Sequence, residues 1–367
     1  MKKIVLFILV VLCISSCKNS TYTIHGSVDN KGLNGKTILI RERINREWKT
    51  IDSTVIENQN FAFKGACDSS KIVYLVYEYP ATNKIRQAFV LENGNITAEI
   101  DTVGFMVIKG TSQNDLLQTY QDEKNAFNKK SESFYASHKD SLKTPEQELA
   151  LSKEIEKLNR EEVSIDKKFA TEHVNSLVGT FVFMNSFYGL NLTEKESIIN
   201  LMNADTKTVK RIGEIIADME IEKKVAVGNT YIDFKLPGIN GESIALSDLV
   251  GKTNFVLVDF WASWCGPCMK FLPELQAFYA KHQGADLDIL GVSLDDNKEA
   301  WTSTVKAHKI SWKLVSDLKG WKCEGSRAYA VNSIPCTVLI DKNGKIVGKN
   351  LSIPEMEKLL LENGTKK

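Results

Sequence analysis

Two cysteines separated by two residues, Cys265 and Cys268, carry the clearest chemistry in this sequence. They follow an apolar run at residues 258–261 that favours a buried strand, and they precede a segment, 269–282, that can form a helix. Partial positive charge and unpaired N–H groups at a helix N-terminus favour a thiolate over a thiol. The arrangement therefore predicts dithiol–disulfide exchange, with Cys265 as an exposed nucleophile and Cys268 as the more buried thiol that resolves the mixed disulfide.

A zinc site and a structural disulfide are the alternative uses of such a pair. A four-ligand zinc site needs a second cysteine pair or histidines at metal-binding spacing. A structural bridge rarely spans two residues beside tryptophans such as Trp261 and Trp264. We therefore favour redox exchange and expect neither a metal nor a cofactor. The other candidate ligands are scattered along the chain without clustering: Cys67, Cys323, Cys336, His25, His138, His173, His282 and His308.

Asp259 is the acidic residue of the apolar run, six residues before Cys265. A carboxylate in such surroundings should have a raised pKa, because burial disfavours its charged form. It could then accept the proton of Cys268 through a water molecule while Cys268 attacks the mixed disulfide. The alternative is a buried aspartate that takes no part in the chemistry.

Three segments resemble a known family. Residues 264–268, Trp-Cys-Gly-Pro-Cys, look like the active-site signature of thioredoxins, and residues 333–341, SIPCTVLID, look like the strand that carries the cis-proline of that fold. Residues 231–252 are similar to the membrane-tethered disulfide reductases of bacterial envelopes, the TlpA/ResA type. The resemblance covers about residues 226 to 362. It implies a thioredoxin fold there, with Cys265 and Cys268 as the redox-active disulfide.

The same resemblance implies further site residues. Asp259 matches the buried acid of thioredoxins. Pro335 would follow a cis peptide bond, and its loop would pack against the cysteine pair and offer backbone groups to an extended substrate. Ile334 would line this substrate groove, and Trp264 would shield the nucleophile or contact partners.

Two positions depart from the family pattern. The family often has Glu three residues after the second cysteine, where this chain has Phe271. The carry-over of substrate specificity is therefore unsafe. Cys336 follows Pro335 directly, where Thr is usual. This third thiol is either an inert strand residue, a trap for intermediates, or a partner of Cys323.

The N-terminus reads as a targeting segment. Lys2 and Lys3 precede an apolar run of eleven residues at 4–14. A membrane span needs about 20 residues, so this shorter run fits the apolar part of a signal peptide instead. Residues 14–17, Ile-Ser-Ser-Cys, resemble a bacterial lipobox in which Cys17 is lipidated. We expect a lipid anchor that holds the protein in the cell envelope, on a membrane facing the periplasm, with the inner and outer membranes both open. The alternative is an ordinary secretory signal.

Charge and length restrict the function classes. The chain has 47 Lys and Arg against 46 Asp and Glu, and loss of Lys2 and Lys3 leaves 45 against 46. A net charge near −1 without a long basic run argues against nucleic-acid binding. The length of 367 residues predicts two or three domains.

Composition shifts divide the chain into a signal peptide (1–16), an antiparallel β domain (17–112), a helical linker or spacer (113–225) and an α/β domain (226–367), and the resemblance above implies a thioredoxin fold for the last of these. Asn34-Gly35 and Asn93-Gly94 read as hairpin-type turns of the β domain. By resemblance this domain is an N-terminal domain of unknown function found on thioredoxin-like lipoproteins of Bacteroidetes. The strands expected within it are 22–28, 37–41, 61–63, 72–77 and 96–100.

The spacer and the C-terminal domain show helix signals. Capping boxes at Thr144 and Thr193 each predict a helix start, and a further helix is expected over 206–219. The early strands of the C-terminal domain should pair in parallel and the last two as an antiparallel hairpin. The elements expected there are strands 255–261, 287–294, 337–340 and 345–349, and helices 267–281, 298–308, 324–329 and 352–363.

The sequence thus predicts a thiol–disulfide oxidoreductase that mainly reduces disulfide-bearing client proteins and is recharged by an electron donor in the membrane. The Gly-Pro dipeptide matches thioredoxin, whose reduction potential is about −270 mV, rather than strong oxidants, whose potential is about −120 mV. The alternatives are a disulfide oxidase or isomerase, a thiol peroxidase, and a non-enzymatic binding lipoprotein.

Overall fold

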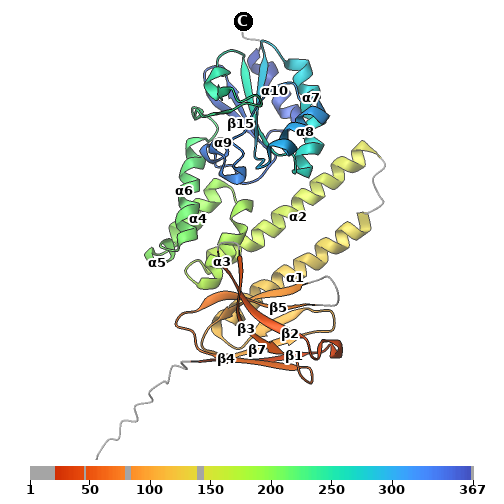
Figure 1. Ribbon diagram of the computed structural model, residues 1–367, viewed down its shortest axis with the longest axis vertical. Coiled ribbons are helices and arrows are strands. Elements are labelled where there is room, and N and C mark those ends of the chain that lie inside the picture. Colours follow the sequence, from red (N-terminus) through yellow and green to blue (C-terminus); the bar gives the residue numbers. More distant parts are fainter. Residues whose placement is uncertain (1–20, 45–46, 79–83, 139–143, 365–367) are drawn as a thin grey trace, which may run out of the picture. The chain divides into compact units, whose positions relative to one another are not determined.

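The structure is a computed structural model that describes residues 21–44, 47–78, 84–138 and 144–364 (Figure 1). The chain forms two compact units: residues 1–190 with 194–206, and residues 191–193 with 207–367. In the described part of the chain, no helix is both long enough and apolar enough to cross a membrane.

The N-terminal unit is built on two four-stranded sheets. Apolar side chains of both sheets, among them Ile24, Ile96, Ile38 and Leu75, form one buried core. The first sheet has the order β4 (Asn60–Gly65), β1 (Tyr22–Val28), β7 (Gly94–Ile100) and β8 (Met106–Lys109). The second has the order β3 (Glu47–Val55), β2 (Thr37–Ile44), β5 (Lys71–Glu78) and β6 (Lys84–Leu91).

The predicted β domain is confirmed, but its pairing is not entirely antiparallel. Strands β1 and β7 pair in parallel, from Tyr22 opposite Gly94 to Val28 opposite Ile100. The chain passes through the second sheet between them, and such a long crossover allows two strands to run in the same direction. The hairpin predictions for Asn34-Gly35 and Asn93-Gly94 are also wrong. Each of these turns leads from a strand of one sheet to a strand of the other sheet.

The middle region is helical, as predicted. Its helices are α1 (Ser112–His138), α2 (Pro145–Glu172), α3 (Leu177–Ser186), α4 (Leu192–Leu201), α5 (Ala204–Lys207) and α6 (Lys210–Lys224). The capping box at Thr144 is confirmed: its hydroxyl accepts the N–H of Gln147, and the side chain of Gln147 accepts the N–H of Thr144.

Two of the helix starts differ from the prediction. The box at Thr193 is wrong because α4 already begins at Leu192. The single helix over 206–219 is interrupted at Val209, whose ψ of 120° is extended, so α5 and α6 are separate. Helix α1 is joined to the β sheets, since the amide of Asn114 both accepts the N–H of Val90 and donates to its carbonyl, each at 2.8 Å.

The C-terminal unit contains a five-stranded mixed sheet. Strand β11 pairs in parallel with β12 and antiparallel with β14, and β14 and β15 form the predicted antiparallel hairpin. Every residue of β11 is buried, as expected for a central strand. The sheet order is β13 (Lys313–Val315), β12 (Leu287–Ser293), β11 (Phe255–Trp261), β14 (Cys336–Asp341) and β15 (Ile346–Lys349).

The helices that follow α6 in this unit lie close to their predicted ranges. They are α7 (Gly266–His282), α8 (Lys298–His308), α9 (Glu324–Ala328) and α10 (Ile353–Gly364), and α7 and α10 are joined by the Lys281–Glu357 ion pair. The prediction missed β13 and a two-stranded sheet of β9 (Lys235–Pro237) and β10 (Ser243–Ala245). The predicted α/β thioredoxin fold is confirmed.

Candidate active site

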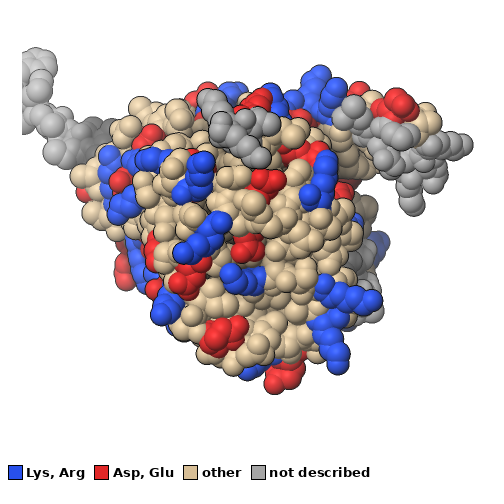
Figure 2. Space-filling model, turned by 90° about the horizontal axis from the view of Figure 1, so that it is seen from above, with Lys and Arg blue, Asp and Glu red and all other residues tan. Residues whose placement is uncertain are grey.

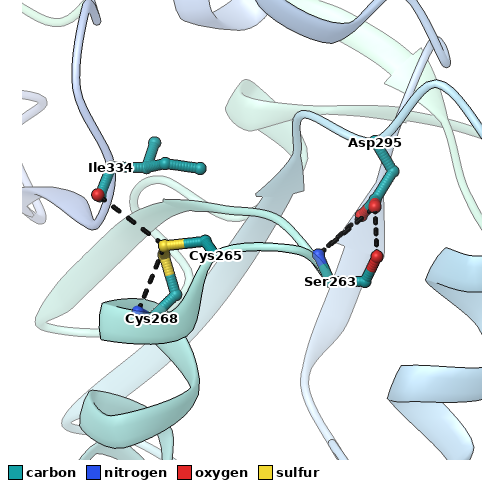
Figure 3. Close-up of a disulfide and its surroundings, with 5 residues drawn as sticks. All are labelled: Ser263, Cys265, Cys268, Asp295 and Ile334. Atoms are coloured by element: carbon teal, nitrogen blue, oxygen red, sulfur yellow. Dashed lines mark hydrogen bonds between the residues drawn. A yellow bond between two sulfur atoms is a disulfide. The ribbon is translucent and has the colours of Figure 1, made fainter. Parts of the chain in front are cut away.

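The cysteine pair lies where β11 gives way to α7. Cys265 is the N-cap residue of α7, and Cys268 occupies its first turn. The two sulfurs are bonded at 2.00 Å, and the backbone N–H of Cys268 donates to Sγ of Cys265 at 3.1 Å (Figure 3). Once the pair is reduced, this N–H and the positive end of the helix dipole stabilise a thiolate on Cys265.

The predicted difference in exposure between the two cysteines is not found. Cys265 and Cys268 are each only 4% exposed. Sγ of Cys265 lies 3.7 Å from the carbonyl oxygen of Ile334, which covers it from the facing loop (Figure 3). The prediction of an exposed Cys265 sulfur is therefore wrong for the disulfide state, because a segment distant in sequence packs over it.

Asp259 lies on β11 and is buried beneath the site. Its Oδ1 has no hydrogen-bond partner among the described residues. Burial raises its pKa from 3.8 to about 7, because the charged carboxylate loses its hydration. At neutral pH both the acid and the carboxylate are therefore populated.

A small cavity of about 10 Å³ joins Asp259, Cys268 and Pro335. This is about the smallest space that can hold one water molecule. Phe271, which stands where the family often has Glu, lines the same cavity, so an aromatic ring replaces an acidic group beside the buried cysteine.

The loop before β14 contains the cis peptide bond Ile334–Pro335. Strand β14 begins at the next residue, Cys336, which pairs with Phe260 of β11. This register places the loop beside the end of β11, where the chain turns towards the cysteine pair. The structure therefore brings Cys265, Cys268, Asp259, Ile334 and Pro335 together in one region.

The three remaining cysteines of the described chain are free thiols. Cys336 and Cys323 are both buried, and they are not bonded to each other, so that alternative is not realised in this structure. Burial raises the pKa of Cys336 to about 11 and also raises that of Cys323, which keeps both thiols protonated at neutral pH. Cys67 belongs to the N-terminal unit and is half-buried there.

Asp295 is a site residue that the sequence prediction missed. Its buried carboxylate accepts the N–H of Ser263 at 3.1 Å and the hydroxyl of Ser263 at 2.5 Å (Figure 3). It also accepts the hydroxyl of Ser293 at 2.7 Å. Ser263 belongs to a turn closed by the hydrogen bond from Cys265 N–H to the carbonyl of Ala262, at 3.1 Å. Asp295 therefore holds the turn that presents Cys265.

A signal for Asp295 was available in the predicted pairing. Strands 255–261 and 287–294 were expected to be parallel, and the carboxyl ends of parallel neighbours meet at one edge of a sheet. Residues just after both strands, Ser263 and Asp295, are therefore candidates for contact. No group of three or more His, Cys, Asp or Glu side chains that could hold a metal ion occurs among the residues with described positions.

The fold and the site define a thioredoxin-like dithiol–disulfide protein. Residues 227–349 match the AhpC/TSA family, and residues 22–117 match the domain of unknown function DUF4369. The thiol-disulfide oxidoreductase ResA of Bacillus cereus is 32% identical over 138 residues, which are 38% of this chain and 77% of the relative.

Two further proteins are similar to part of this chain. The sporulation thiol-disulfide oxidoreductase A of Bacillus subtilis is 32% identical over 128 residues, 34% of this chain and 72% of the relative. A solved thiol-disulfide oxidoreductase from Bacteroides fragilis is 29% identical, with 36% of this chain and 99% of that chain covered and a TM-score of 0.34. The chain belongs to the ResA-type thiol-disulfide oxidoreductases, and it carries an N-terminal DUF4369 domain.

Proposed function

We propose that this thiol-disulfide oxidoreductase reduces disulfides of client proteins in the cell envelope. The observation that carries the proposal is the Cys265–Cys268 disulfide at the start of α7, with the N–H of Cys268 directed at Sγ of Cys265. A sulfur held in this way is activated as a thiolate when the pair is reduced, and it has a second thiol in bonding distance.

The exchange proceeds in two steps. The Cys265 thiolate attacks one sulfur of the client disulfide, so that a Cys265–client bond forms, the client S–S bond breaks and one client thiolate leaves. The Cys268 thiolate then attacks Sγ of Cys265. The internal disulfide re-forms, the second client sulfur leaves as a thiolate, and two electrons have passed from the cysteine pair to the client.

Asp259 serves the second step as a proton acceptor. Cys268 is buried and must lose its proton before it can attack, and the cavity that it shares with Asp259 has room for one relaying water. A carboxylate with a pKa of about 7 is matched to this task at neutral pH.

The client is held beside the pair by the groove of Trp264, Ile334 and Pro335. The carbonyl of Ile334 lies 3.7 Å from Sγ of Cys265 and is therefore placed next to the client sulfur in the mixed disulfide. An extended client segment can use this backbone edge for hydrogen bonds, as an added strand does.

The direction of exchange follows from the redox potential of the pair. A reductase must lose its electrons to ordinary protein disulfides, so its potential lies well below that of an oxidant such as DsbA, at about −120 mV. Equilibration with thiol redox buffers tests this direction, and the same result separates a reductase from an oxidase or isomerase.

The envelope location is proposed from residues 1–20, which lie outside the described part of the chain. The apolar run 4–14 and the lipobox-like residues 14–17 support a lipid anchor on Cys17. Cys17→Ala is therefore expected to move the protein from the membrane fraction to the soluble fraction in cell fractionation. A variant that sediments with membranes as the native chain does would contradict the anchor.

Proteins are proposed as the partners: disulfide-bearing clients and an electron donor in the membrane. Figure 2 supports this choice, because Lys and Arg side chains are interspersed with Asp and Glu on the face that it shows. A face of mixed charge offers no extended basic patch to a phosphate backbone.

A further inference from the structure

A second tryptophan stands beside the one that precedes the nucleophile. Trp321 belongs to a short 3₁₀ helix, η4 (Gly320–Lys322), and its ring centroid lies 6.1 Å from that of Trp264. Trp264 is 54% exposed and Trp321 is 41% exposed. Trp321 lies far from the Cys-x-x-Cys motif in sequence, so only the fold brings the two rings together.

The segment that carries Trp321 is held firmly in place. The hydroxyl of Ser316 accepts the N–H of Leu318 at 3.1 Å and donates to the carbonyl of Ser293 at 2.9 Å. The carboxylate of Asp317 accepts the N–H of Glu324 at 3.2 Å, which closes the other side of η4. A ring on a fixed segment loses little conformational entropy when it binds another group.

The two tryptophan-bearing segments share one support. The backbone carbonyl of Ser293 accepts the hydroxyl of Ser316, and the hydroxyl of Ser293 donates to Asp295. Asp295 in turn holds the turn at Ser263, directly before Trp264. The backbone segments that carry Trp264 and Trp321 are therefore connected through Ser293, and the two rings contact each other. Together they form an exposed apolar surface beside Cys265.

We propose that Trp264 and Trp321 together bind an apolar side chain that neighbours the client's reacting half-cystine. Trp321 is then a specificity residue of the proposed reductase, on whose function this inference rests. The clients would be proteins that carry a large apolar residue next to their exchangeable disulfide.

The occupant follows from the chemistry of the mixed disulfide. The client sulfur must bond to Sγ of Cys265, and consecutive Cα atoms are about 3.8 Å apart, so the client residues next to the half-cystine reach the surface that adjoins Cys265. That surface includes the exposed rings of Trp264 and Trp321. Exposed aromatic rings contribute most binding free energy when they bury apolar area, so they favour an apolar side chain of the client.

The test compares two disulfide-linked peptides that differ only in the residue next to the reacting half-cystine, Phe in one and Ser in the other. The full chain is first reduced, and the second-order rate constant for its oxidation by each peptide is measured in a single turnover. The native chain is expected to prefer the Phe peptide by about tenfold, the size of discrimination that a modest apolar contact gives. Trp321→Ala should bring the ratio close to one, and Trp321→Phe should keep part of the preference.

Lys322→Ala is the matched control, because it changes the neighbouring exposed residue and leaves both rings. It should keep the native preference, and the redox potential of all variants should equal that of the native chain. A preference unchanged in Trp321→Ala, or no preference in the native chain, would overturn the inference. Failure of the native chain to reduce either peptide would instead count against the proposed reductase itself.

Discussion

Cys268→Ser is expected to stop turnover and to accumulate a covalent complex with the client. Cys265 can still attack a client disulfide, but no second thiol remains at the start of α7 to release it. Turnover should fall by about three orders of magnitude or more, as when a nucleophile is removed. Non-reducing electrophoresis and peptide mass mapping would show one client joined to Cys265.

Two further variants give this prediction its controls. Cys265→Ser should lose both turnover and the complex. Cys336→Ser should keep both, because the Cys336 thiol is buried and its pKa of about 11 leaves it protonated. A complex that forms through Cys336, or normal turnover in Cys268→Ser, would show that the pair is not the reacting site.

Asp259→Asn is expected to slow resolution of the mixed disulfide while it stabilises the fold. Asn has the same shape but cannot accept the proton of Cys268, so the resolution rate should fall by about 10²-fold or more, the usual contribution of a general base. In the native chain this rate should rise with pH through about pH 7, where Asp259 loses its proton. In the variant that rise should be absent, as measured by stopped-flow decay of a pre-formed complex.

The stability effect has a definite sign. Because the folded state raises the pKa of Asp259 from 3.8 to about 7, it binds the proton more tightly than the unfolded state does. The resulting stability is fully present below pH 3.8 and is lost as pH rises to about 7, where the loss reaches about 4 kcal/mol.

Asp259→Asn avoids this loss, so its urea midpoint should exceed that of the native chain at pH 8. The two midpoints should converge towards pH 4. A variant that resolves at the native rate would leave Asp259 as a buried residue without a catalytic role, and a variant destabilised at pH 8 would contradict the burial argument.

The parts of the site that are close in sequence could be predicted. An apolar run, a Cys-x-x-Cys turn and a helix-forming segment give β11 and α7 from local pattern alone, and they place Asp259 under the pair. Resemblance to a family supplied the loop with Ile334 and Pro335, whose cis bond no local pattern determines.

The parts that depend on long-range packing could not be predicted. The burial of Cys265 comes from Ile334, 69 residues away, and the Trp264–Trp321 pair needs η4 to fold back on the active-site turn. Strand β13 and the β9–β10 pair have three residues each, too few to show an alternation of apolar and polar side chains. The parallel pairing of β1 with β7 is a matter of topology, which strand composition does not specify.

The reduction potential of the Cys265–Cys268 pair tests the central proposal most directly. The full chain would be equilibrated in dithiothreitol redox buffers, and the state of each cysteine would be read by alkylation and mass spectrometry. We predict a single two-electron couple at about −270 mV, with Cys67, Cys323 and Cys336 reduced in all of the buffers. A couple above about −180 mV would contradict a reductase and favour an oxidase or isomerase, and failure of the pair to form its disulfide would contradict thiol–disulfide exchange altogether.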